Sequence, residues 1–152
     1  MASFKYNGVD ALDLTFEKMA NLSGEDLLRI IRPGAELLRE RLIEKVRTIF
    51  TQRSGSLANS FKLKERVWAD GAGISVLPTG KHPKSSTGKR RGKRRSNGSY
   101  QSTNAEIAFI LEHGSPRIGA THFMENTAEE SEQEVYNAMD AELTQILRER
   151  GL

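Results

Sequence analysis

Apolar residues recur at intervals of three and four positions toward both ends of the chain, which is the spacing of one face of an α-helix. This spacing predicts helices from 9 to about 21, from 33 to about 50 and from 122 to 150. Ser23 is suited to cap a further helical segment, which Pro33 should end or kink because proline lacks an amide hydrogen. A helical hairpin or one kinked long helix is therefore expected in this region. The expected apolar stripes are Val9, Leu12, Phe16, Met19 and Ala20; Ala35, Leu38, Leu42, Val46 and Ile49; and Ala128, Val135, Met139, Leu143 and Ile146.

Between these helices the apolar period shortens to about two, which is typical of β-strands. Residues 61–68 alternate in this way, turn-forming residues follow at 70–73, and 74–77 predict a short return strand closed by Pro78. The apolar run 106–111 predicts a further, buried strand. The predicted fold class is α+β, with a small antiparallel or mixed β-sheet packed against long N-terminal and C-terminal helices. The strand residues expected to support assembly are Phe61, Leu63, Val67, Ile107, Phe109 and Leu111.

Residues 79–103 consist mainly of Gly, Ser, Lys and Arg, and we name them the basic segment. Its expected place is a loop inserted between two strands of a single domain that covers 1–152. Its few apolar side chains cannot offset the entropy of ordering, so a mobile loop is expected in an isolated monomer. The rest of the chain carries 15 basic against 20 acidic residues, so a mildly acidic body bears one basic arm. The eight basic residues of the segment are Lys81, Lys84, Lys89, Arg90, Arg91, Lys93, Arg94 and Arg95.

Three interpretations of the basic segment remain open. Lysine and arginine release counterions from phosphates, so the segment could bind nucleic acid without sequence preference. Guanidinium groups also form paired hydrogen bonds with carboxylates, so an acidic protein surface is another candidate partner. The third interpretation is a solvated loop without a partner. Tyr100 is the only aromatic residue nearby, which gives base stacking weak support.

The sequence shows no constellation typical of an enzyme. It contains no cysteine, which excludes disulfides, thiolate metal sites and cysteine nucleophiles. Glu112, His113 and His122 are acid and imidazole groups close in sequence, but zinc hydrolases supply three ligands at a recognisable spacing, so a strand-end carboxylate and two surface histidines are expected. No serine lies in a nucleophile elbow, and no glycine run matches a phosphate loop. We therefore expect no catalysis, no cofactor and no metal.

Neither a signal peptide nor a membrane span is expected. Acidic residues interrupt the N-terminal region, and no apolar run reaches the roughly 18 residues that a span requires. The protein is thus expected in a cytoplasm or in something assembled there. A thin sheet leaves strand edges uncovered, and an uncovered edge favours pairing with a neighbouring chain. We expect a homo-oligomer, either a dimer or a closed ring.

Three stretches taken together resemble the tail-completion family of long-tailed bacteriophages, neck proteins similar to the tail terminator of lambda-like phages. Residues 53–60 (RSGSLANS) follow a long helix and match the family's threonine-glycine-x-leucine-x-x-serine block. Residues 104–114 (NAEIAFILEHG) match its apolar strand, which ends in glutamate, an aromatic residue or histidine, and glycine. Phe123 opens the last helix, where the family has a proline-phenylalanine pair. Ser54 replaces the usual threonine and His122 the usual proline, without a change in spacing.

The resemblance implies a structural component of the virion and not an enzyme. Family members sit in the neck, commonly as rings of six, where they end tail growth or join tail to head. The partners that the resemblance implies are further copies of the chain in a hexameric ring, a head-side connector or stopper protein, the tail tube protein and packaged DNA in the lumen. It implies no contact with a membrane. The location implied is the virion neck, after assembly in the host cytoplasm. The basic segment would then face DNA or a neighbouring ring.

Three other functions stay open. The first is a nucleic-acid-binding protein with a basic arm. The second is another neck role, such as that of a stopper or head-completion protein. The third is a metal-dependent hydrolase built on Glu112, His113 and His122.

Overall fold

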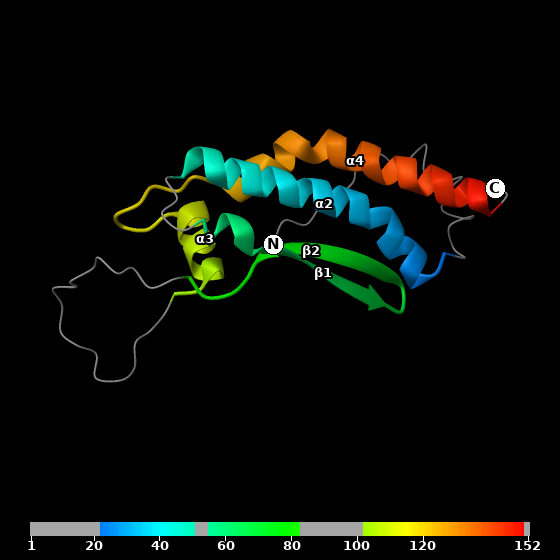
Figure 1. Ribbon diagram of the computed structural model, residues 1–152, viewed down its shortest axis with the longest axis horizontal. Helices are drawn as coiled ribbons and strands as arrows, with labels where there is room; N and C mark the ends of the chain where they lie inside the picture. Colours follow the sequence, from blue (N-terminus) through cyan, green and yellow to red (C-terminus); the bar gives the residue numbers. More distant parts are fainter. Residues whose placement is uncertain (1–21, 51–54, 83–101, 151–152) are drawn as a thin grey trace.

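The fold has three layers, with one helix between a second helix and a β-hairpin. A computed structural model describes residues 22–50, 55–82 and 102–150. Helices α2 and α4 run antiparallel and side by side, and the hairpin of β1 and β2 lies along the other side of α2 (Figure 1). The predicted α+β class is confirmed, whereas the helix predicted at 9–21 lies outside the described residues. The elements are α2 (Gly24–Ile49), the 3-10 helix η1 (Ala58–Ser60), β1 (Phe61–Trp68), β2 (Gly71–Pro78), α3 (Asn104–His113) and α4 (Phe123–Glu149).

Helix α2 is one continuous helix, so the alternative of a helical hairpin is wrong. Ser23 caps it as predicted, because its hydroxyl accepts a hydrogen bond from the Asp26 amide (3.2 Å) while its own amide donates to the Asp26 carboxylate (2.9 Å). Pro33 lies inside the helix. A proline there costs roughly 3 kcal/mol. The next two residues, Gly34 and Ala35, are buried, and this packing keeps the helix intact.

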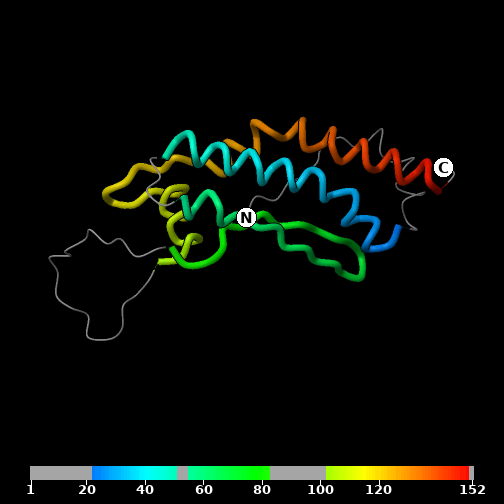
Figure 2. The backbone as a smooth tube through the Cα atoms, in the orientation of Figure 1, coloured from blue at the N-terminus to red at the C-terminus, as the bar shows by residue number. Residues whose placement is uncertain are grey.

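The hairpin is longer than its sequence predicts. β1 and β2 pair over their full length, from Phe61 opposite Pro78 to Trp68 opposite Gly71. The prediction of a short return strand is therefore wrong, because Gly71 and Gly73 extend β2 instead of forming the turn. The tube in Figure 2 shows the tip of the hairpin beside the start of α2.

The predicted strand at 106–111 is wrong, because these residues belong to helix α3. The Thr103 side chain accepts from the Glu106 amide (3.2 Å), and the Glu106 carboxylate accepts from the Thr103 amide (2.8 Å). This capping box, a threonine three residues before a glutamate, was the sequence signal that the apolar run obscured. Two further predictions fail with the strand. The basic segment lies between β2 and α3, not between strands, and three of the expected assembly positions are helical: Ile107, Phe109 and Leu111.

The predicted C-terminal helix is confirmed as α4, and its first residue anchors the core. Phe123 is completely buried, and its ring meets that of Phe50 edge to face with centroids 5.4 Å apart. Around it gather side chains from α2, from the segment before β1 and from α3. The core residues are Leu42, Val46, Leu57, Ala58, Phe61, Ala108 and Phe123.

At the other end of the α2–α4 pair, ion pairs join the helices. Arg29 binds Glu149 through both terminal nitrogens (2.7 and 3.1 Å) and reaches Glu142 with Nε (2.7 Å). Arg150 pairs with Asp26. The hydrogen bonds from Arg29 lower the pKa of Glu149 to about 2. These groups are exposed or half-exposed, so they position the helix ends more than they stabilise the fold.

Gly34 lets α2 and α4 approach closely. A Cβ atom at this position would lie 2.9 Å from Cγ1 of Val135 and 2.8 Å from Cγ of Met139. We expect Gly34→Val to destabilise the fold by about 1–3 kcal/mol, because the added atoms must displace α4. Valine is intrinsically a better helix former than glycine, so propensity cannot cause a loss. The measurement is the midpoint of denaturant unfolding.

The matched control for this prediction is Gly119→Val. A Cβ atom at Gly119 meets nothing within 4 Å. This variant should unfold at the wild-type denaturant concentration. Equal losses for the two variants would contradict the close helix contact at Gly34.

The ion pair of Glu149 predicts a pH dependence of stability. Its folded pKa of about 2 lies below the ordinary value of 4.5. The ionised carboxylate therefore stabilises the fold above pH 4.5, and this contribution is lost as the pH falls toward 2. Thermal unfolding should show wild type slightly more stable than Glu149→Gln near neutral pH, with the two curves converging in acid. The control is Glu132→Gln, an exposed residue of the same helix, which should have the stability of wild type at each pH. A difference in stability between wild type and Glu149→Gln that persists in acid would contradict the ion pair as its cause.

Candidate assembly site

The two ends of the basic segment are held together at one point of the fold. The amide of His82 donates to the carbonyl of Ser102 (2.8 Å), and the amide of Asn104 donates to the carbonyl of Gly80 (2.9 Å). Lys81 and Thr103 form an antiparallel bridge between them. We call residues 79–82 and 102–104 the base of the basic segment. Of the eight basic residues in the segment, Lys81 lies here and is exposed, and the other seven lie outside the described residues.

Asn104 is the side chain that fixes this base. It is 3% exposed, and its amide nitrogen donates to the carbonyl of Thr79 (2.8 Å). Its Oδ1 accepts from the Ser56 hydroxyl (3.1 Å) and lies 3.1 Å from Nδ1 of His82. A buried amide with such partners has one orientation, because each polar atom must be satisfied. The start of α3, the end of β2 and the segment before η1 therefore meet at Asn104.

Glu112 caps the start of α4 from the end of α3. Its side chain is buried, and its two oxygens accept from the amides of Met124 (2.8 Å) and Glu125 (3.1 Å). His122 precedes α4 in a left-handed conformation and supplies no side-chain cap of its own. Glu112 thus provides the acceptors and the negative charge that a helix N-terminus favours.

The expected strand-end carboxylate is wrong, because Glu112 is buried at the end of helix α3, whereas His113 and His122 are exposed as expected. Ligand atoms of Glu112, His122 and Glu125 lie within 4.8 Å of one another. His113 is not in this group, and its ring lies against Phe109 with centroids 4.5 Å apart. Because both Glu112 oxygens already accept backbone hydrogen bonds, a structural cap accounts for the cluster without an ion.

The predicted assembly residues divide between core and surface. Phe61 is buried, and Leu63, Ile107 and Leu111 are half-buried, so these four contribute to packing. Val67 is 52% exposed at the hairpin tip, and Phe109 is 63% exposed on α3. Next to Phe109 along α3, Ile110 is 39% exposed, which makes this an apolar helix surface. Each of β1 and β2 also has one edge without a strand partner in the described part of the chain.

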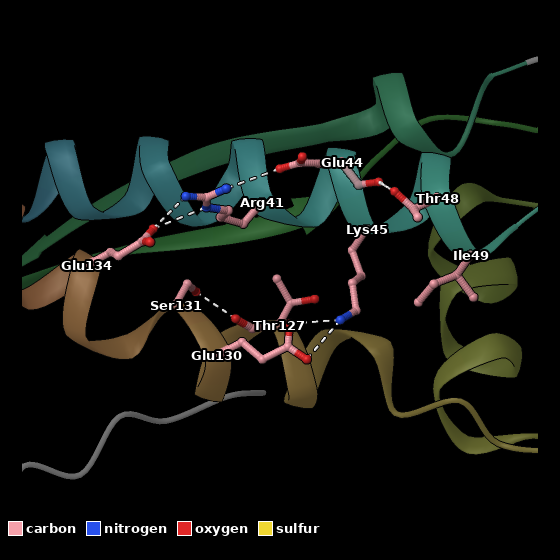
Figure 3. Close-up of a pocket in the computed structure, with 9 residues that line it drawn as sticks. All are labelled: Arg41, Glu44, Lys45, Thr48, Ile49, Thr127, Glu130, Ser131 and Glu134. Carbon is pink, nitrogen blue, oxygen red and sulfur yellow. Dashed lines mark hydrogen bonds and ion pairs between the residues drawn. The ribbon is translucent and has the colours of Figure 1, made fainter.

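A groove of about 470 Å³ lies between α2 and α4 (Figure 3). Two ion pairs cross it, Lys45 with Glu130 and Arg41 with Glu134, both at 2.8 Å. The hydroxyls along it bond to carbonyls of their own helices. These charged and hydroxyl groups already have partners within the chain, so the groove favours a structural role over a catalytic one. The residues that line it are Arg41, Glu44, Lys45, Thr48, Ile49, Thr127, Glu130, Ser131 and Glu134.

Among residues 22–50, 55–82 and 102–150, no helix combines the length and apolar character needed to cross a bilayer.

The capping role of Glu112 predicts the effect of removing its carboxylate. Glu112→Ala leaves two half-buried amides at the start of α4 without acceptors, which should destabilise the fold by about 1–3 kcal/mol. Chemical unfolding with and without a chelator measures this loss. It should be the same in both conditions, because a cap needs no ion. A loss of stability that disappears in the chelator would instead indicate that Glu112 is a metal ligand. The control is Glu125→Ala, which removes another carboxylate of the cluster and leaves the Glu112 cap in place.

Comparison of the chain with protein-family models, curated proteins and solved structures finds no match. The assignment of these surfaces therefore depends on the residues themselves and on their geometry.

Proposed function

We propose that this chain is a structural component of the neck of a long-tailed phage, which assembles with copies of itself into a ring that joins the tail tube to the head-side connector. One observation carries the proposal. The described parts of the three stretches that resemble the tail-completion family, although far apart in sequence, meet in one buried junction. The second stretch does so as helix α3, where the resemblance implies a strand. Leu57 and Ala58 come from the first stretch, Ala108 from the second, and Phe123 opens α4.

The polar residues of the same stretches also have structural roles. Ser56 binds Asn104 across the junction, and Glu112 caps α4. Gly114 has a φ of 81°, and a Cβ atom there would lie 2.8 Å from the amide nitrogen of Ala120. The shared pattern therefore corresponds to residues that build a scaffold, which supports a structural role over catalysis.

The surfaces left uncovered support contacts between subunits. These surfaces are the apolar face of α3 and, in the described part of the chain, the outer edges of β1 and β2. Burial of a surface that contains Phe109 and Ile110 would favour association. The base of the basic segment lies beside α3, so assembly through α3 would bring the basic segments of neighbouring subunits together (Figure 1).

A nucleic-acid-binding protein with a basic arm remains the second candidate. The observation that favours it is the closed base, which presents the basic segment from a fixed point of the fold. A monomer whose nucleic-acid affinity falls steeply with salt would support this alternative.

Replacement of the exposed apolar residues on α3 tests the ring. We expect the purified chain to form rings in negative stain that cap isolated tail tubes, and Phe109→Ser with Ile110→Ser to give smaller species in light scattering. The control is Ile49→Ser, which removes a side chain 45% exposed on α2. Wild-type protein that stays monomeric at high concentration and ignores tail tubes would refute the proposal.

A further inference from the structure

The outward face of the hairpin carries a row of positive charges that ends at a tryptophan. Lys62, Lys64, Arg66 and Trp68 are all exposed and alternate along β1. Side chains two residues apart on a strand lie about 6.8 Å from each other on the same face. The cations are therefore evenly spaced along a straight line.

The opposite face of β1 is turned toward α2, which settles the direction of the row. Glu65 forms an ion pair with Arg32 of α2 (2.9 Å). Val67 lies against Gly24 at the start of α2. Because side chains alternate between the two faces of a strand, the even-numbered residues of β1 point away from the helices, and Figure 1 shows α2 and α4 on one side of the hairpin only.

β2 adds no acidic side chain to this face and leaves it shallow near the tryptophan. Lys64 lies opposite Ser75, Arg66 opposite Gly73, and Trp68 opposite Gly71. The ring of Trp68 lies over Gly73, since a Cβ atom there would be 2.9 Å from Cη2 of the ring. The tryptophan is nevertheless 54% exposed. Because Gly71 and Gly73 of β2 have no side chains, a planar group can reach the Trp68 ring from this side of the hairpin.

The three cations of the row are not neutralised within the described part of the chain. No ion pair there includes Lys62, Lys64 or Arg66. The hairpin contains two acids, Glu65, which is paired with Arg32, and Asp70 in the turn. An anionic ligand is the one that this face favours electrostatically.

We propose that this face binds single-stranded nucleic acid, with phosphates along the cations and a base stacked on Trp68. An exposed aromatic ring in line with cations favours a single strand, because the bases of a duplex are not free to stack on a side chain. A nucleic-acid strand combines the phosphates that the cations favour with bases that can stack on the ring. The inference does not depend on the proposed neck function, and it concerns residues outside the basic segment.

The only tryptophan of the chain reports on its own site. We expect a thymidine oligonucleotide of about 12 bases to quench the fluorescence of Trp68, within the usual site size of 4–16 nucleotides. In anisotropy titrations with a labelled oligonucleotide, Trp68→Ala should weaken binding roughly fivefold to a hundredfold. The double variant Lys64→Ser with Arg66→Ser should make the plot of log K against log salt less steep, because its negative slope should shrink in magnitude by about 1.4.

A charge-matched variant distinguishes this face from general electrostatics. Arg117→Ser with Arg148→Ser removes the same charge from exposed sites outside the hairpin and should keep both the quenching and most of the affinity. Replacement of Arg90, Arg91, Arg94 and Arg95 by serine should lower the total affinity and preserve the quenching. Circular dichroism melting confirms that each variant is folded.

Three outcomes would overturn the proposal. Equal effects of the two double variants would show that only net charge matters. Loss of quenching in the variant of the basic segment would assign binding to that segment alone. The third outcome is that another polyanion binds equally well. Such a result would be a duplex bound as tightly as the single strand, or a polyglutamate peptide that displaces the oligonucleotide and binds Trp68→Ala as tightly as wild type.

Discussion

Burial of Phe123 at the junction of four segments is the interaction on which the rest of this structure depends. Phe123 of α4 is completely buried in a cluster with residues of α2, of the segment from Leu57 to Phe61 and of α3, and its ring meets that of Phe50. Full burial of such a side chain contributes roughly 1.5–3 kcal/mol. More importantly, it fixes where α4 begins relative to α3, which brings Glu112 to the first amides of α4. Packing and capping therefore reinforce each other at this end of the molecule.

The two ends of the molecule are held by different kinds of contact, and this difference bears on function. The junction is apolar and buried, and the base of the basic segment and the exposed surface of α3 lie beside it. At the far end, exposed ion pairs such as that of Arg29 with Glu149 join the helices, and such pairs weaken with salt. The proposed contact surface of α3 lies at the junction, whereas the tip of the hairpin lies at the far end, beside the start of α2.

Two positively charged elements adjoin one another in this fold. The chain passes from the last residue of β2, Pro78, directly into the base of the basic segment, where Lys81 is exposed. The hairpin offers cations at fixed positions, whereas the basic segment offers a high density of charge after Lys81. Such a pair of elements would suit a protein that binds a polyanion. The basic segment would attract the polyanion, and the hairpin would position it.

Local signals in the sequence were enough for α4, for the start of α2 and for β1. The three- and four-residue spacing predicted α4, Ser23 predicted the start of α2, and alternation predicted β1. The apolar run 106–111 could not be assigned by periodicity, because a buried strand and a short helix leave the same pattern. The local capping box of Thr103 and Glu106 marks the helix, and Ala108 on that helix packs into the core.

The same limit applies to the sites. The sequence determined which residues carry charge, because composition is local. Only the tertiary structure determined which face of β1 lies against α2, and hence that its cations and Trp68 point outward. Pairing between β1, β2 and α2 is a property of segments brought together by folding, and no single segment encodes it.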